Sequence, residues 1–94
     1  MQTIEGVGKV YDAEGKQLVA DVKYKIWWKP QNANIHEKWE GELTIEHDIW
    51  PLGTHVIELE DGRKGTCIVG GAISWKRGIG MFYKYKFQGS GSLG

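Results

Sequence analysis

The chain has 94 residues, 40% of them hydrophobic and 26% charged, which are ordinary values for one globular domain. Twelve Lys and Arg residues balance twelve Asp and Glu residues, so no global charge attracts the protein to nucleic acid or to an anionic membrane. No apolar run approaches the roughly 18 residues needed to cross a bilayer, and residues 1–6 lack the pattern of a secretion signal. We therefore expect a cytoplasmic protein with no membrane association.

The first two predicted strands, 2–11 and 17–29, form a hairpin. In the second, apolar residues at every other position alternate with charged residues, which predicts a strand with one solvated face. Residues 13–15 between them, Ala-Glu-Gly, fit a three-residue loop with glycine in the left-handed conformation. Such a loop would place Val10 opposite Leu18.

The third and fourth strands are predicted at 36–47 and 54–60. The segment 48–53 between them is too apolar for a free loop, and we expect it to fold over one end of the structure as a plug. After the fourth strand, a three-residue loop at 60–62 with a bulge is favoured over a two-residue turn. The longer loop keeps the apolar residues of both adjoining strands on one face.

The fifth and sixth strands are predicted at 63–76 and 80–88. The pair Gly70-Gly71 interrupts the fifth, but the apolar alternation resumes with the same parity, which predicts one long strand that bends. The Gly/Ser-rich end, 89–94, is either a flexible linker or cloning remnant, or a continuation of the last strand. On the second interpretation, glycines in the first and last strands would let these two strands pair and close a barrel.

These elements predict an all-β protein, a small six-stranded antiparallel barrel or closed sandwich formed by residues 1–88 as a single domain. No segment shows the apolar spacing of a helix. Side chains are expected to fill the interior, because six short strands enclose little lumen. The predicted core consists of Tyr24, Ile26, Trp39, Leu43, Ile45, Ile57, Leu59, Cys67, Val69, Tyr83 and Tyr85.

No catalytic residue, cofactor or metal site is predicted. The candidate nucleophiles Cys67 and Ser74 lack an evident base, and Cys67 is expected inside the barrel, where desolvation raises its pKa. His36, His47 and His55 lie far apart in the sequence, without the short spacing of metal ligands. A single buried cysteine also indicates a reducing compartment.

One candidate binding surface is predicted, on the outer face of two strands. Trp27 and Trp28 are neighbours in one strand, so they point to opposite faces, and Trp27 has the parity opposite to the core. Phe82 has the same outward parity in the last strand. The predicted surface consists of these two aromatic residues and the lysines of the same strands, Lys23, Lys25, Lys29, Lys84 and Lys86.

This surface predicts a non-catalytic binding or interaction module that forms a homodimer or binds a protein partner. In a dimer the lysines of one copy would face the acidic row of Glu40, Glu42 and Glu46 in the other. An alternative is single-stranded nucleic acid or a glycan, because aromatic rings on a small barrel stack on bases and sugars. Further alternatives are a small enzyme or ligand carrier, or a functionally silent Trp27 packed under the 48–53 segment.

Overall fold

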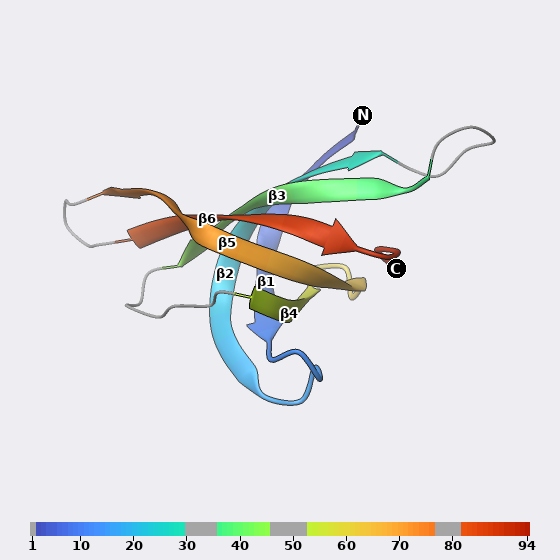
Figure 1. Ribbon diagram of the computed structural model, residues 1–94, viewed down its shortest axis with the longest axis horizontal. Helices are drawn as coiled ribbons and strands as arrows, with labels where there is room; N and C mark the ends of the chain where they lie inside the picture. The colour runs from blue at the N-terminus through green and yellow to red at the C-terminus, as the bar shows by residue number, and fades with distance from the viewer. Residues whose placement is uncertain (1, 30–35, 46–52, 77–81) are drawn as a thin grey trace.

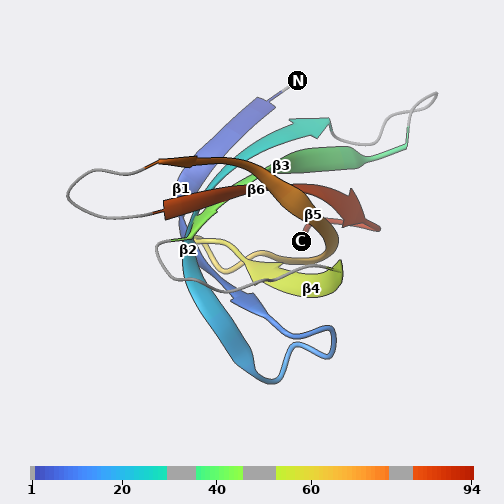
Figure 2. The ribbon, with the colours of Figure 1, turned by 60° about the vertical axis from the view of Figure 1, so that its left-hand side comes forward.

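The protein is a closed barrel of six antiparallel strands (Figures 1 and 2), and this confirms the all-β prediction. The computed structural model describes residues 2–29, 36–45, 53–76 and 82–94, with the side chains of 71–76, 82 and 83 outside the description. There is no helix among the described residues. The strands are β1 (Gln2–Tyr11), β2 (Leu18–Lys29), β3 (Lys38–Ile45), β4 (Gly53–Glu58), β5 (Lys64–Lys76) and β6 (Phe82–Ser90).

The barrel consists of two three-stranded meanders, β1-β2-β3 and β4-β5-β6, which join through β1 with β4 and β3 with β6. The registers of the six ladders fit a pseudo-two-fold axis, apart from the shifts in β1–β2 after Val10 and in β5–β6 after Val69. Val10 pairs with Ile57 at one seam and Glu42 with Lys86 at the other. Pairs elsewhere in one meander have counterparts in the other: Tyr24 opposite Leu43 corresponds to Val69 opposite Phe87.

This topology shows that the expected pairing of the first and last strands is wrong, because β6 lies between β3 and β5. The glycines of β1 instead leave room for groups of the neighbouring strands. A Cβ atom on Gly8 would collide with the Glu58 carbonyl oxygen of the neighbouring β4, and one on Gly6 would lie 2.6 Å from the Tyr24 hydroxyl. Glycine therefore permits close approach within the β1–β2–β4 seam.

The first hairpin differs from the predicted register. Val10 lies opposite Ala20, and Tyr11 lies opposite Leu18, with a bulge between the two pairs. The connection is longer than three residues, since the Asp12 N–H donates to the Gln17 carbonyl at 2.9 Å. The register moves by two residues, so each side chain stays on its predicted face. Gly15 has the expected left-handed conformation, with φ of 73°.

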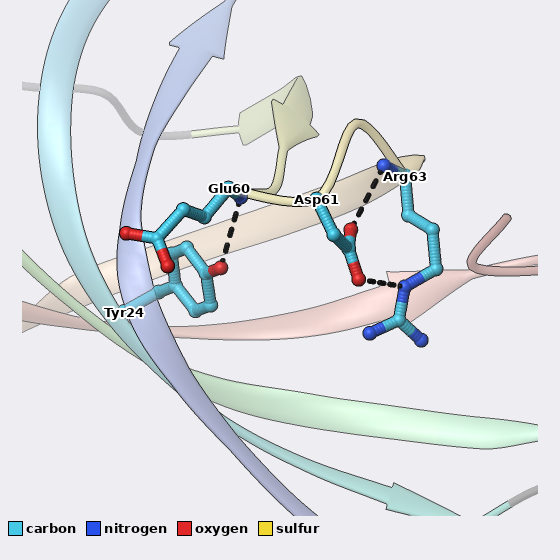
Figure 3. Close-up of polar contacts among 4 residues, drawn as sticks. All are labelled: Tyr24, Glu60, Asp61 and Arg63. Carbon is cyan, nitrogen blue, oxygen red and sulfur yellow. Dashed lines mark hydrogen bonds and ion pairs between the residues drawn. The ribbon is translucent and has the colours of Figure 1, made fainter.

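The β4–β5 connection is the predicted three-residue loop, residues 60–62. The Leu59 N–H donates to the Arg63 carbonyl at 2.7 Å, and Gly62 has φ of 93°. The Asp61 carboxylate accepts bonds from the Arg63 N–H at 3.1 Å and from its Nε at 2.8 Å (Figure 3). These bonds keep the pKa of Asp61 below its ordinary value. The loop is thus held by its own side chains.

The same loop is tied to β2 from inside the barrel. Figure 3 shows the Tyr24 hydroxyl directed at the backbone of Glu60, whose N–H donates to it at 3.0 Å. Tyr24 is 5% exposed, so this bond satisfies a buried hydroxyl. The tyrosine therefore links the two meanders as well as filling the core.

The core matches the prediction wherever side chains are described. Ten of the predicted core residues are buried, and Tyr83, the eleventh, has its side chain outside the described residues. Trp39 is the largest of the fully buried side chains, and its ring N–H donates to the Gly91 carbonyl at 3.0 Å. The remaining buried apolar residues are Val10, Ala20, Val22, Phe87 and Leu93.

The last two strands and the C-terminal residues form one continuous system. β5 is a single strand with register shifts between Val69 and Ala72 and between Ala72 and Ser74, which confirms the predicted bend. Beyond β6, Leu93 is buried, and Gly94 exchanges backbone bonds with Lys64 at 3.0 and 3.4 Å. Residues 91–94 thus pack onto the barrel. Most of the predicted plug, residues 48–52, lies outside the description.

Candidate functional site

The outer face of the sheet carries a groove that crosses four strands. Trp27 of β2 lies opposite Glu40 of β3, Glu40 opposite Gln88 of β6, and Gln88 opposite Ile68 of β5. These four residues form one row perpendicular to the strands, with an apolar side chain at each end and polar groups between. Cross-strand neighbours of this kind are in side-chain contact range.

The groove has a volume of about 490 Å³. Besides the four residues of the row, Glu42 and Lys86 from the adjacent row line it, and glycines at positions 41 and 70 add no side chain. A Cβ atom on Gly70 would meet only the Lys86 carbonyl oxygen, at 3.6 Å. The surface is therefore hollow over β5, where Gly70 adds no side chain.

Trp27, the central residue of the predicted surface, is half-buried and lines this groove. The Lys25 ammonium lies 5.6 Å from the centre of its ring, a cation–π distance, and 3.8 Å from the Glu5 carboxylate. Lys23 and Lys29 are exposed elsewhere on β2, opposite Thr44 and Lys38 respectively. Trp27 and Lys25 are thus the two residues of this strand that the structure brings together.

Lys84 and Lys86 belong to β6, which is separated from β2 by β3. Lys86 lines the groove, and Lys84 pairs with Glu42 at 3.8 Å. The backbone of Phe82 pairs with Lys76, but the Phe82 side chain is not among those described. The predicted surface is therefore assembled only in part, around Trp27, Lys25 and Lys86.

The strand order changes the electrostatics of this face. Because β3 lies between the two lysine-bearing strands, Glu42 sits opposite both Lys25 and Lys86. The face is a pattern of alternating charges and not one basic stripe. A row of lysines aimed at phosphates would need a continuous positive potential, which the intervening carboxylates reduce.

Gln88 and Ile68 are groove residues that were not predicted, and Glu40 was expected only in the acidic row that would face the lysines of a second copy. Glu40 is half-buried, and within the described part of the chain its carboxylate has no hydrogen bond or ion pair. Ile68 is 54% exposed, among the most exposed large apolar residues described. The available signal was their outward parity, which Ile68 shares although it lies in an apolar run.

A second polar cluster closes the end of the barrel near the C-terminus. The Glu37 carboxylate accepts bonds from the Trp28 indole N–H and from the Leu93 N–H, each at 2.9 Å. The Leu93 bond is the main cause of the lowered pKa of Glu37, with Trp28 and Ser92 contributing and burial opposing. This cluster joins β2 to the C-terminal residues, so its hydrogen bonds are explained by their role in holding the structure together.

The other candidates for chemistry do not assemble a site in the described residues. Burial raises the pKa of the Cys67 thiol to about 12, so it is protonated and unreactive at neutral pH. In the same part of the chain, no three His, Cys, Asp or Glu side chains come close enough to hold a metal ion. His47 and the side chain of Ser74 are not described.

The described residues also contain no helix with the length and hydrophobicity required to cross a membrane. Comparisons with protein-family models, with curated proteins and with solved structures find no match to this chain. The geometry of the groove is therefore the basis for the functional argument.

Proposed function

We propose that this protein is a protein-binding module and that its docking surface is the groove around Trp27. The observation that carries the proposal is the row from Trp27 to Ile68. It places two accessible apolar side chains on either side of an amide and of a carboxylate that has no partner among the described residues. Tryptophan is one of the residues enriched at the energetic centres of protein interfaces, in pockets surrounded by polar groups.

The alternation of charge favours a protein over nucleic acid as the ligand. Glu40 and Glu42 lie between the lysines of β2 and β6, so a strand of phosphates laid across the groove would meet carboxylates as well as ammonium groups. A protein surface carries both signs of charge and can match such a pattern.

A partner other than a second copy is favoured by the pairing within one chain. In a homodimer the lysines of one copy would have to face the Glu40 and Glu42 row of the other. Glu42 already faces Lys25 and Lys86 and pairs with Lys84. For Glu42, forming the dimer would exchange these contacts for equivalent ones, with little gain in electrostatic energy.

Selection from a random peptide display library tests the proposal. The wild-type protein should enrich peptides that bind to the groove, and the variant Trp27→Ser should lose most of this binding. The matched control is Val7→Ser on β1, which removes an apolar residue that is 53% exposed and is not part of the groove. Peptides that bind Trp27→Ser as tightly as wild type, or an absence of any enrichment, would contradict the proposal.

We place this function in the cytoplasm. The support is Cys67, the only cysteine of the chain, which is buried as a free thiol and has no disulfide partner. Fractionation of the native host followed by immunoblotting would test this location, and recovery in an oxidising extracellular fraction would contradict it.

A further inference from the structure

We infer that the groove receives an arginine side chain of the partner, with Glu40 as its counter-ion. This inference rests on the protein-binding function proposed above, and it adds the chemistry that the groove recognises. The starting point is that Glu40 is the lining carboxylate without a partner in the described residues, whereas Glu42 is engaged by Lys84 at 3.8 Å.

The position of Glu40 strengthens its interaction with a cation. Glu40 is half-buried between Trp27 and Gln88, so part of its hydration is already replaced by neighbouring side chains. A carboxylate in this position gains more from a cationic partner than one in open solvent, because less water has to be displaced and the local dielectric constant is lower. Lys86, which also lines the groove, lies in the next row, opposite Glu42.

The shape of the groove favours arginine among the cationic side chains. A guanidinium is planar, so it can stack on the Trp27 indole while its N–H groups reach the Glu40 carboxylate and the Gln88 amide oxygen. The methylene part of the side chain can contact Ile68, at the other end of the row. Lysine has a compact ammonium that does not make this flat, forked contact.

The free protein already shows that the Trp27 ring accepts a cation. The Lys25 ammonium lies 5.6 Å from the ring centre, and the Glu5 carboxylate lies 3.8 Å from the same ammonium. An incoming guanidinium would compete with Lys25 for the ring. Lys25 would keep Glu5 as its ionic partner and would still face Glu42 on the adjacent strand.

Capped arginine, as N-acetyl-arginine amide, is the probe for this inference, with N-acetyl-norleucine amide as the uncharged control. Titration followed by the NMR signal of the Trp27 indole N–H should give a larger initial slope with arginine than with norleucine. The variant Glu40→Gln keeps the size of the side chain and should reduce the arginine slope to about one tenth. Lys25→Gln removes the competing cation and should increase it.

The control variant is Glu58→Gln on β4, a carboxylate that pairs with Lys64 at 3.6 Å and takes no part in the groove. It should bind capped arginine like the wild type. Equal slopes for arginine and norleucine, or an unchanged slope in Glu40→Gln, would overturn the inference. A steeper response to capped lysine would overturn the choice of arginine.

The two proposals fail in different ways. If selected peptides need Trp27 but bind Glu40→Gln as well as wild type, protein binding stands and the arginine inference is wrong. If no peptide requires Trp27, the protein-binding function itself is wrong, and the arginine inference, which rests on it, falls as well.

Discussion

At the residue scale, Trp27 and Trp39 show how parity along a strand separates a surface tryptophan from a core one. The alternation of apolar and polar residues predicts that Trp27 points outward and Trp39 inward. In the structure Trp27 is half-buried and Trp39 is 2% exposed. Trp27→Ser should reduce the free energy of unfolding by about 1–2 kcal/mol, and Trp39→Ala by about 3–5 kcal/mol. Urea unfolding followed by far-ultraviolet dichroism measures both, and an equal loss would place Trp27 in the core.

Gly89 is a residue whose importance alternation alone does not reveal. A Cβ atom there would overlap the Trp39 ring, so Gly89→Ala should cost about 2–3 kcal/mol through overpacking. Gly70→Ala is the matched control, because its added methyl group meets nothing closer than 3.6 Å and should change stability by less than about 0.5 kcal/mol. Thermal melts of the two variants compare them directly, and a tolerated Gly89→Ala would contradict this packing.

At the element scale, the strands could be predicted because each has one wet and one buried face, and turn residues mark where the chain reverses. The order of the strands in the barrel could not be predicted from the sequence. Alternation identifies which side chains share a face of one strand, but it does not say which strands are neighbours. The lysines of β2 and β6 were therefore expected on one surface. In the structure β3 lies between them and brings Glu40 and Glu42 into the site.

The amino-acid composition of the C-terminal residues does not show whether they are ordered. Glycine and serine at 89–94 are equally typical of a linker, yet β6 runs to Ser90 and the following residues pack through Leu93 and through bonds to Glu37. That interaction joins residues 56 positions apart in the sequence, and no local pattern indicates such a contact. Only the continued alternation, which reaches Leu93, favoured the ordered interpretation.

The Glu37 interaction predicts a pH dependence of stability. The folded protein binds the Glu37 proton less readily than the unfolded chain, because the Leu93 and Trp28 donors favour the carboxylate. The stabilisation is therefore complete above the ordinary pKa of 4.5 and is lost as the pH falls through the lower pKa of the folded state. Melting temperatures of wild type and Glu37→Gln should differ at neutral pH and converge in acid. A difference that is independent of pH would contradict the assignment.

At the scale of the whole molecule, the barrel is two similar meanders related by a pseudo-two-fold axis, and the groove lies on the face formed by β2, β3, β6 and β5. The axis passes through the Glu42–Lys86 pair beside the groove, and it relates residues of β3 to residues of β6. The groove breaks this symmetry through its side chains: Trp27 is at one end and Ile68 at the other. The fold therefore supplies a regular scaffold, and a few side chains make one face distinctive.

The pairing of charges within one chain predicts the state of assembly. Sedimentation velocity at micromolar concentration should give a single species with the 10.6 kDa mass of the monomer. The reason is that Glu42, which the lysines of a second copy would have to face, is already opposite Lys25 and Lys86 of the same chain. A dimer that dissociates in Trp27→Ser would instead show that this face binds a second copy.

A chemical-shift map of the protein bound to a peptide from the display selection shows directly whether the groove is the binding site. We expect the largest amide shifts on the four strands of the groove, in residues 25–28, 40–42, 68–70 and 86–88. The Trp27 indole N–H should shift with them. Shifts concentrated on β1 and β4, with the Trp27 indole unmoved, would show that the protein binds its partner elsewhere.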